Sequence, residues 1–174
     1  RVPDGSETWE NLPNPTPGST NVETATFTSI YDIQYVTDPD SDDASPLLGQ
    51  EVTINAVVTA EFWGSDDRKF MQVQDADGPW NGVVCYEAEG WDQFSWVDET
   101  GSTVDGPGEG DLITLTGTVN EFYNLTQIVD ATSGIVHSSS DFNIEPDNVL
   151  IGNLGEAYEG CLVEVSNAMV SNPD

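Results

Sequence analysis

Apolar and polar residues alternate along several short stretches of the chain, which is the pattern of half-buried β-strands. The longest such stretch is EVTINAVVTAEFW, residues 51–63. One face of this predicted strand carries only apolar side chains, at Val52, Ile54, Ala56 and Val58. The same alternation predicts four more strands, within residues 69–80, 81–89, 111–124 and 125–140, the last interrupted at Gly134.

No helical periodicity continues for more than about two turns, so the pattern predicts an all-β protein. Residues 27–36 are expected to form a short helix or the start of a strand, and residues 90–110 a long irregular connection. The pattern contains five strands, of which the first is long, and the irregular connection separates the third from the fourth. It predicts a five-stranded OB-like small barrel with flanking β segments. A β-sandwich is the alternative.

The chain is expected to contain three parts. Residues 1–22 are rich in Pro, Gly, Asn and Thr and predict an extended linker or tail. Residues 23–140 hold the predicted barrel. Residues 141–174 contain one further clear strand, which cannot bury a face alone, and therefore predict the beginning of a second β domain or a strand-exchange segment.

The net charge of the protein limits the partners that it is expected to bind. The 174 residues include 32 Asp and Glu against 3 Lys and Arg, a formal net charge of -29. This charge argues against nucleic acid as a partner, because phosphate binding requires a basic surface, and against anionic lipid for the same reason. No apolar run reaches 18 residues, so no membrane insertion is expected. The start at RVPDGS, without Met, is expected of a piece of a longer chain.

Four stretches carry a resemblance to a known family. They are YDIQYVTDP with SPLLGQEVT, FMQVQDADGPWNGVVCY, GDLITLTGTVNEFYNLTQI and LGEAYEGCLVEVSN. Over residues 27–170 the chain resembles the OB-like β modules of large secreted bacterial proteins, which often lie beside extracellular endonuclease domains or ahead of sorting tails. Residues 1–22 resemble the tail of a lamin-tail-type domain. The resemblance implies an OB-like fold, secretion and an accessory role.

Two acidic stretches are candidate calcium sites, since Ca²⁺ prefers carboxylate oxygens. In TDPDSDD, Asp38, Asp40 and Asp42 alternate, but the sixth position is Asp43 and the twelfth is Gly49, which excludes an EF-hand. The alternative is an acidified surface loop in which Ser45-Pro46 to Gly49 lead into the first barrel strand.

The second candidate is DADG, with Asp75 and Asp77, for which a β-turn is the alternative.

Aromatic residues gather at predicted strand ends and in the long connection. Exposed rings there would stack on sugars or on single-stranded bases, with candidates at Trp63, Trp80, Trp91 and Trp96 and neighbours at Phe122 and Tyr123. The alternative is that these rings close the barrel ends. Asn124 opens the sequon Asn-Leu-Thr and is a candidate glycosylation site.

The sequence contains no convincing catalytic set. His137 is the only histidine, and the serines that follow it are adjacent in sequence only. Cys85 and Cys161 fall at inward strand positions and are expected to be buried thiols, with a disulfide between them as the alternative. We therefore expect no enzyme, but a structural or adhesive module of a secreted or cell-surface protein. Its expected partners are neighbouring copies or domains of the same protein, with which it would form a filament or matrix. The alternative is an accessory module that binds polysaccharide or nucleic acid for a secreted hydrolase.

Overall fold

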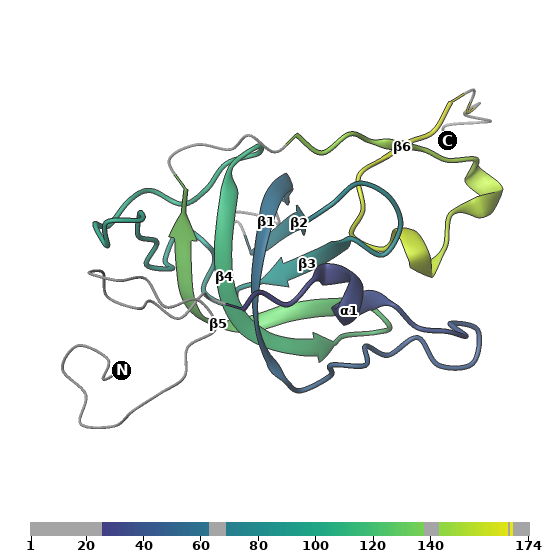
Figure 1. The fold of residues 1–174 in the computed structure, drawn as a ribbon, viewed down its shortest axis with the longest axis horizontal. Coiled ribbons are helices and arrows are strands. Elements are labelled where there is room, and N and C mark those ends of the chain that lie inside the picture. Colours follow the sequence, from purple (N-terminus) through teal and green to yellow (C-terminus); the bar gives the residue numbers. More distant parts are fainter. Residues whose placement is uncertain (1–25, 63–68, 138–142, 167, 169–174) are drawn as a thin grey trace, which may run out of the picture.

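Five strands close into a barrel in the computed structural model, which describes residues 26–62, 69–137, 143–166 and 168 (Figure 1). The strands are β1 (Glu51–Phe62), β2 (Phe70–Gln74), β3 (Gly82–Tyr86), β4 (Leu112–Glu121) and β5 (Thr126–Val136). Their order around the barrel is β1-β2-β3-β5-β4, and β4 pairs again with β1. The predicted five-stranded small barrel is therefore confirmed, and the alternative of a sandwich is wrong.

One seam of the barrel differs from the others. β3 and β5 run parallel and pair only through Val84 with Gln127 and Cys85 with Ile128. The remaining four pairings are antiparallel and longer. The short parallel seam brings the turn between β4 and β5 beside the outer face of β2 and β3.

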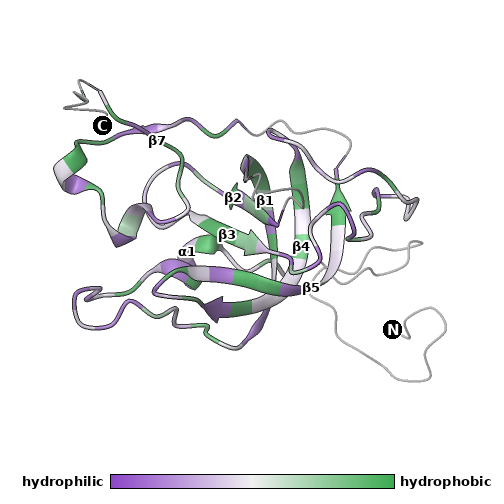
Figure 2. Ribbon diagram, turned by 180° about the vertical axis from the view of Figure 1, so that it is seen from behind, coloured by the Kyte–Doolittle hydropathy of each residue, from purple (hydrophilic) through white to green (hydrophobic). Residues whose placement is uncertain are grey.

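The core follows the predicted period of two. The four apolar residues of β1 belong to the core together with apolar residues of the other strands. Figure 2 shows apolar and polar positions following one another along β4 and β5. Further core residues from β2 to β5 are Met71, Val73, Val83, Cys85, Ile113, Leu115, Val119 and Ile128. The helix α1 (Ile30–Gln34) adds Ile30 and Ile33, and its first turn is capped by the Ser29 hydroxyl, which accepts a hydrogen bond from Asp32 N at 3.1 Å.

An interior aromatic cluster of Trp91, Phe94 and Trp96 packs against this core. Its residues lie in the irregular connection between β3 and β4. Gly134 permits the packing, because a Cβ atom there would lie 2.6 Å from the Trp96 ring. The predicted break of β5 at Gly134 is therefore wrong: the strand continues, and the glycine accommodates an indole. The irregularity falls earlier, where the pairing of β4 and β5 shifts register and Asp130 has a φ of 50°.

Residues 143–166 lie against the barrel and contain only short elements. These are β6 (Asp147–Asn148), η1 (Ile151–Asn153), η2 (Glu156–Tyr158) and β7 (Val163–Glu164), with β6 and β7 parallel. Trp80 N donates to the Ala157 carbonyl at 2.6 Å, and Leu162 N donates to Gln74 Oε1 at 2.5 Å. That residues 141–174 begin a second domain stays a prediction, and residues 1–22 lie outside the described part.

Candidate functional site

Four aromatic rings lie on the outside of the barrel, two of them half-buried (Phe70 and Tyr86) and two exposed (Phe122 and Tyr123). We call Phe70, Tyr86, Phe122 and Tyr123 the aromatic platform. Phe70 and Tyr86 face each other across β2 and β3, with ring centroids 5.0 Å apart. Phe122 and Tyr123 lie at the turn between β4 and β5, with centroids 4.7 Å apart and planes at 87°. The short parallel seam thus unites rings from two separate hairpins.

A hollow of about 210 Å³ lies between Phe122 and the pair formed by Phe70 and Tyr86. These three residues and Gln127 line it. Gln127 is buried at the seam, and its register partner is Val84 on β3. Rings around a hollow can stack on a flat apolar face of a ligand.

The turn that carries Tyr123 adopts a backbone conformation that its sequence disfavours. Phe122 and Leu125 exchange backbone hydrogen bonds of 3.0 and 3.2 Å, and Tyr123 and Asn124 have φ angles of 53° and 62°. Two successive positive φ angles define a type I′ turn, whose usual residues are Asn-Gly. A bulky residue at the first position is strained, and the Tyr123 side chain is 89% exposed, so core packing does not compensate. Strain of this kind concentrates at functional positions.

The predicted tryptophan platform is partly wrong. Trp91 and Trp96 are only 3% and 1% exposed, because they close the barrel as members of the interior aromatic cluster, so neither offers a face to a ligand. Trp80 is half-buried and packs its ring edge-on against Tyr35, with centroids 5.5 Å apart. Trp63 lies outside the described residues.

Phe70 and Tyr86 were not among the sequence candidates, although the alternation contains the signal for them. Met71, Val73, Val83 and Cys85 point inward, which places the flanking Phe70 and Tyr86 on the outside of the sheet. These two rings face each other because of the register between β2 and β3. The alternation within a single strand does not specify that register.

The acidic loop does not gather its carboxylates. Within the described ranges, no group of three or more His, Cys, Asp or Glu side chains could hold a metal ion. The Asp38 carbonyl accepts hydrogen bonds from Ser41 N and Asp42 N, and Asp42 Oδ1 accepts one from Ala44 N at 3.2 Å. These hydrogen bonds fold the stretch that contains Asp40 into turns. Calcium binding by Asp38, Asp40 and Asp42 stays a prediction to which the geometry adds no support.

The end of the acidic loop is fixed against β4. Ser45 N donates to Glu121 Oε1 at 3.0 Å, and the Ser45 hydroxyl donates to the Ile33 carbonyl at 2.5 Å. Gly49, with a φ of 78°, donates its N–H to the Val119 carbonyl at 2.8 Å. Residues 45–49 therefore lead the chain into β1, as the sequence predicted.

The carboxylates of the second calcium candidate contact different segments. Asp75 Oδ2 accepts a hydrogen bond from Ile30 N at 2.8 Å, and Asp77 Oδ1 accepts one from Glu145 N at 2.9 Å. Burial raises the pKa of Asp75 above its ordinary value, with a smaller contribution from the charge of Asp32. The two carboxylates thus connect the turn to α1 and to the C-terminal segment.

Glu159 belongs to an acidic junction between the C-terminal segment and the barrel. Its Oε1 accepts a hydrogen bond from Thr126 N at 2.9 Å, at the start of β5. Burial, and then the charges of Glu156 and Glu121, raise the pKa of Glu159 to about 7, against the opposing hydrogen bonds from Thr126 and Gln34. The junction therefore titrates near neutral pH.

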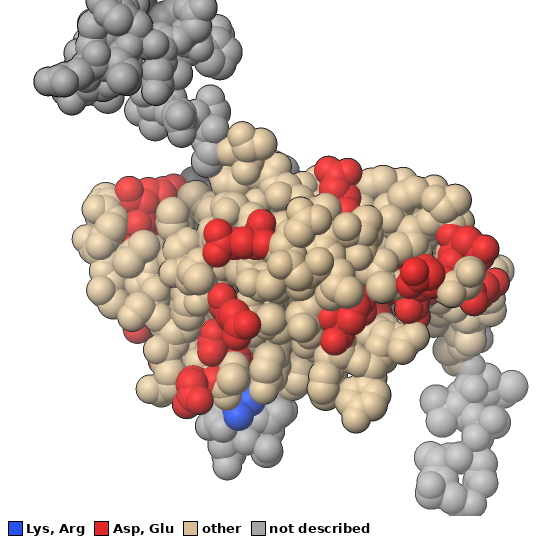
Figure 3. All heavy atoms as spheres, turned by 90° about the horizontal axis from the view of Figure 1, so that it is seen from below, with Lys and Arg blue, Asp and Glu red and all other residues tan. Residues whose placement is uncertain are grey.

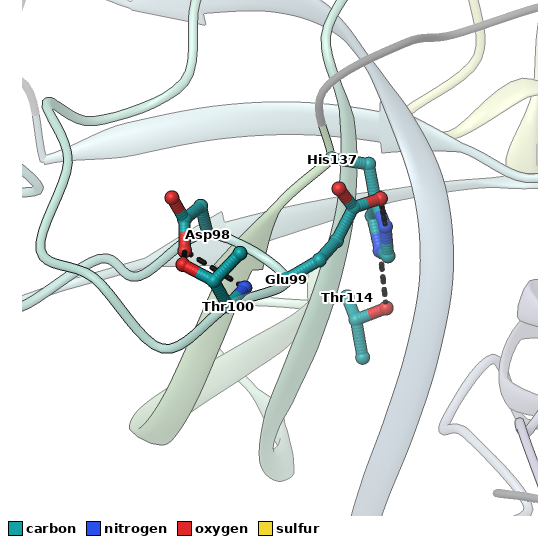
Figure 4. A network of polar contacts seen from close by, with 5 residues as sticks. All are labelled: Asp98, Glu99, Thr100, Thr114 and His137. Carbon is teal, nitrogen blue, oxygen red and sulfur yellow. Dashed lines mark hydrogen bonds and ion pairs between the residues drawn. The ribbon is translucent and has the colours of Figure 1, made fainter.

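His137 takes part in a polar chain at the end of β5 (Figure 4). Its Nε2 lies 2.9 Å from the Thr114 hydroxyl, and its Nδ1 lies 3.1 Å from Glu99 Oε1. Hydroxyl, imidazole and carboxylate are the groups of a nucleophile relay, but a relay also requires a substrate cavity and oxyanion donors. The three cavities described here are lined by other residues. We assign this network of polar side chains a structural role, since it connects β4, β5 and the 97–104 loop. Asp98 accepts hydrogen bonds from Thr100 in that loop, which lowers the pKa of Asp98.

Both cysteines are free, so the alternative of a disulfide is wrong. Cys85 is fully buried in β3, and burial raises the pKa of its thiol far above the ordinary range. Cys161 is partly buried rather than inward-facing in a strand, and burial also raises its pKa. Neither thiol has the lowered pKa of a nucleophile.

The candidate glycosylation site lies beside the platform. Asn124 is exposed in the turn after Tyr123, and its amide donates a hydrogen bond to Asp43 Oδ2 at 2.5 Å. That contact holds the turn against the acidic loop. Glycosylation of Asn124 stays a prediction.

The charge on the protein surface disfavours the binding of anions. Figure 3 shows acidic side chains distributed in separate groups over one face of the molecule. Lys69 is the only Lys or Arg within the described residues. A field of this sign repels phosphate groups and attracts cations.

Comparison with protein-family models, with curated proteins and with solved structures finds no match for this chain. The resemblance to OB-like modules of secreted proteins, and the extracellular location that it implies, therefore stay predictions. Across the described ranges, no helix has the length and apolar character needed to cross a membrane.

Proposed function

We propose that this chain is a non-catalytic module of a secreted or cell-surface protein that binds polysaccharide on the aromatic platform. The observation that carries the proposal is Tyr123, 89% exposed and fixed in a strained turn next to Phe122. An exposed ring in an unfavourable backbone conformation has no evident role in folding.

Sugar rings fit the platform better than bases do. The apolar faces of pyranose rings stack on aromatic side chains, and the residues that line the hollow are three aromatic residues and one neutral polar residue, Gln127. Bases also stack on aromatic rings, but single strands carry phosphates that need a basic groove. With a net charge of -29, the chain favours neutral or cationic polysaccharides over nucleic acid.

The test is affinity electrophoresis with a panel of soluble neutral and cationic polysaccharides, followed by calorimetry on those that retard the protein. Phe122→Ala should weaken binding about tenfold or more, because a stacked ring contributes about 1–3 kcal/mol. Tyr31→Ala is the matched control, since it removes an exposed ring of α1 that does not line the hollow. Absence of binding, or equal losses in both variants, would refute the proposal. A salt-sensitive complex with single-stranded DNA would favour the nucleic-acid alternative.

A second candidate function is assembly with neighbouring copies or domains in an extracellular filament or matrix. The C-terminal segment exposes three large apolar side chains close together in sequence, at Leu150, Ile151 and Leu154. Exposed apolar residues of this density are a common feature of interfaces. Sedimentation at increasing concentration tests it: Leu150→Ser should shift any association toward monomer, whereas a wild-type chain that stays monomeric throughout would oppose assembly.

A further inference from the structure

The C-terminal segment is held on the barrel by polar contacts rather than by core packing. None of its described residues, 143–166, belongs to the hydrophobic core, and Val149 is the one apolar side chain among them that is buried. One of the contacts that hold the segment is the hydrogen bond from Trp80 N to the Ala157 carbonyl, at 2.6 Å. A segment that buries so little apolar surface can open locally while the rest of the domain stays folded.

Two glycines mark the place where this segment lies directly against the barrel. A Cβ atom on Gly82, the first residue of β3, would lie 2.3 Å from the Gly160 carbonyl oxygen. A Cβ atom on Gly160 would lie 2.8 Å from the Gly82 carbonyl carbon, and Gly160 has a φ of 68°. The close approach therefore requires glycine on both sides. We call residues 156–162 the docking segment.

Next to this contact, two carboxylates from different parts of the chain converge on one buried residue, Thr126. Thr126 N donates to Glu159 Oε1 at 2.9 Å, and the Thr126 hydroxyl donates to Glu121 Oε1 at 2.7 Å. Glu121 Oε1 also accepts a hydrogen bond from Ser45 N at 3.0 Å, which stabilises its charge. Two carboxylates held on one residue repel each other when both are ionised, so Glu159 is the one that retains a proton.

The charged groups that raise the pKa of Glu159 are all acidic. Glu121 faces it from β4, and Glu156 faces it from the docking segment itself. Asp43 of the acidic loop acts in turn on Glu156. Burial is the largest cause, and together these effects outweigh the opposing hydrogen bonds, one of them from Gln34 on α1, and raise the pKa of Glu159 to about 7. An ionised Glu159 therefore opposes docking.

We propose that Glu159 is a proton-operated latch for the docking segment. With its carboxyl protonated the segment stays on the barrel, and with its carboxyl ionised the segment opens locally while the barrel remains closed. Because docking raises the pKa above the ordinary 4.5, docking is strongest near pH 4.5 and weakens as the pH rises through 7. The latch is independent of polysaccharide binding at the aromatic platform.

The test is amide hydrogen exchange of the full chain, followed by NMR at pH 6 and pH 8 and corrected for the intrinsic effect of pH on exchange. Protection of the Trp80 and Thr126 amides should fall by up to about tenfold, the ratio that linkage gives for pKa values of about 7 when docked and 4.5 when open. The Val119 amide, which donates to the Gln50 carbonyl at 2.9 Å, is the reference within the barrel. Low urea should speed exchange at Val119 and not at Trp80, because a local opening exposes little surface.

Glu159→Gln retains an acceptor oxygen and removes the charge, so protection of the Trp80 amide should no longer fall between pH 6 and pH 8. Glu164→Gln, the same change at an exposed position of the C-terminal segment, should retain the wild-type fall. Gly160→Ala should open the segment at pH 6 at least as far as the wild type opens at pH 8, which keeps the test valid if Glu159→Gln unfolds. Exchange at Trp80 that matches Val119 in rate and urea dependence, or an equal pH dependence in all variants, would overturn the proposal.

Discussion

The interior aromatic cluster and the aromatic platform have the same chemistry and opposite surroundings. Trp91, Phe94 and Trp96 come from an irregular connection and are enclosed by the core, with Gly134 leaving space for one indole. Phe122 and Tyr123 come from a regular hairpin and remain in solvent. The comparison shows that a regular hairpin can present rings outward, whereas a loop without regular structure can supply the largest fully buried side chain of the barrel, Trp96.

The largest expected effect comes from removing an interior ring. Trp96→Ala should lower the free energy of unfolding by about 3–5 kcal/mol, because it deletes a side chain that is 1% exposed and leaves a cavity. Urea unfolding followed by circular dichroism measures it. Phe122→Ala is the matched platform change and should stay within about 0.5 kcal/mol of wild type. Equal losses in the two variants would abolish the distinction between the cluster and the platform.

An intermediate effect on the free energy of unfolding is expected at Glu159. This residue of the C-terminal segment accepts a hydrogen bond from Thr126 N at the start of β5. Its folded-state pKa of about 7 is above the ordinary 4.5, so the folded chain binds the additional proton. This contribution to stability is complete near pH 4.5 and is lost as the pH rises through 7.

Glu159→Gln should therefore flatten the decline of stability between pH 4.5 and 7. At pH 8 the gain should be about 1 kcal/mol, after allowance for the solvent that reaches this half-buried side chain. Thermal unfolding across this pH range measures it. Glu164→Gln, which removes the same charge at an exposed position of β7, should retain the wild-type slope. A parallel shift in both variants would indicate a general effect of net charge.

The smallest effect on stability, and the most specific one, is expected at Tyr123. Tyr123→Gly places the residue best suited to a positive φ in the turn, and should raise the free energy of unfolding by up to about 1 kcal/mol. The same change should weaken polysaccharide binding. Denaturant unfolding and calorimetry on one preparation measure both quantities. A variant that is less stable than wild type would show that the ring contributes to packing.

Alternation within strands predicted the barrel because inward side chains such as Ile54 and Leu115 recur at every second position. The same rule failed for residues 90–110, where burial of Trp91 and Trp96 depends on contacts with distant strands. The aspartates Asp38, Asp40 and Asp42 suggested a metal loop by spacing alone. Their backbone folds into turns instead, and spacing does not specify the direction of carboxylates in a loop.

The platform depended on information that no single stretch contains. Phe70 and Tyr86 become a pair through the register of β2 and β3, and they meet Phe122 only because β3 and β5 pair. Tyr123 was visible as an aromatic in a turn, but its positive φ follows from the two-residue loop between β4 and β5. These are long-range consequences of barrel closure.

The short parallel seam between β3 and β5 also links recognition to folding. Its two residue pairs join segments about 40 positions apart, which makes closure a late and entropically costly step. Rings from both sides of the seam line the same hollow, so a ligand spanning them binds the closed barrel alone. Such a ligand would stabilise the closed barrel. It would raise the melting temperature by mass action and slow amide exchange most at the seam.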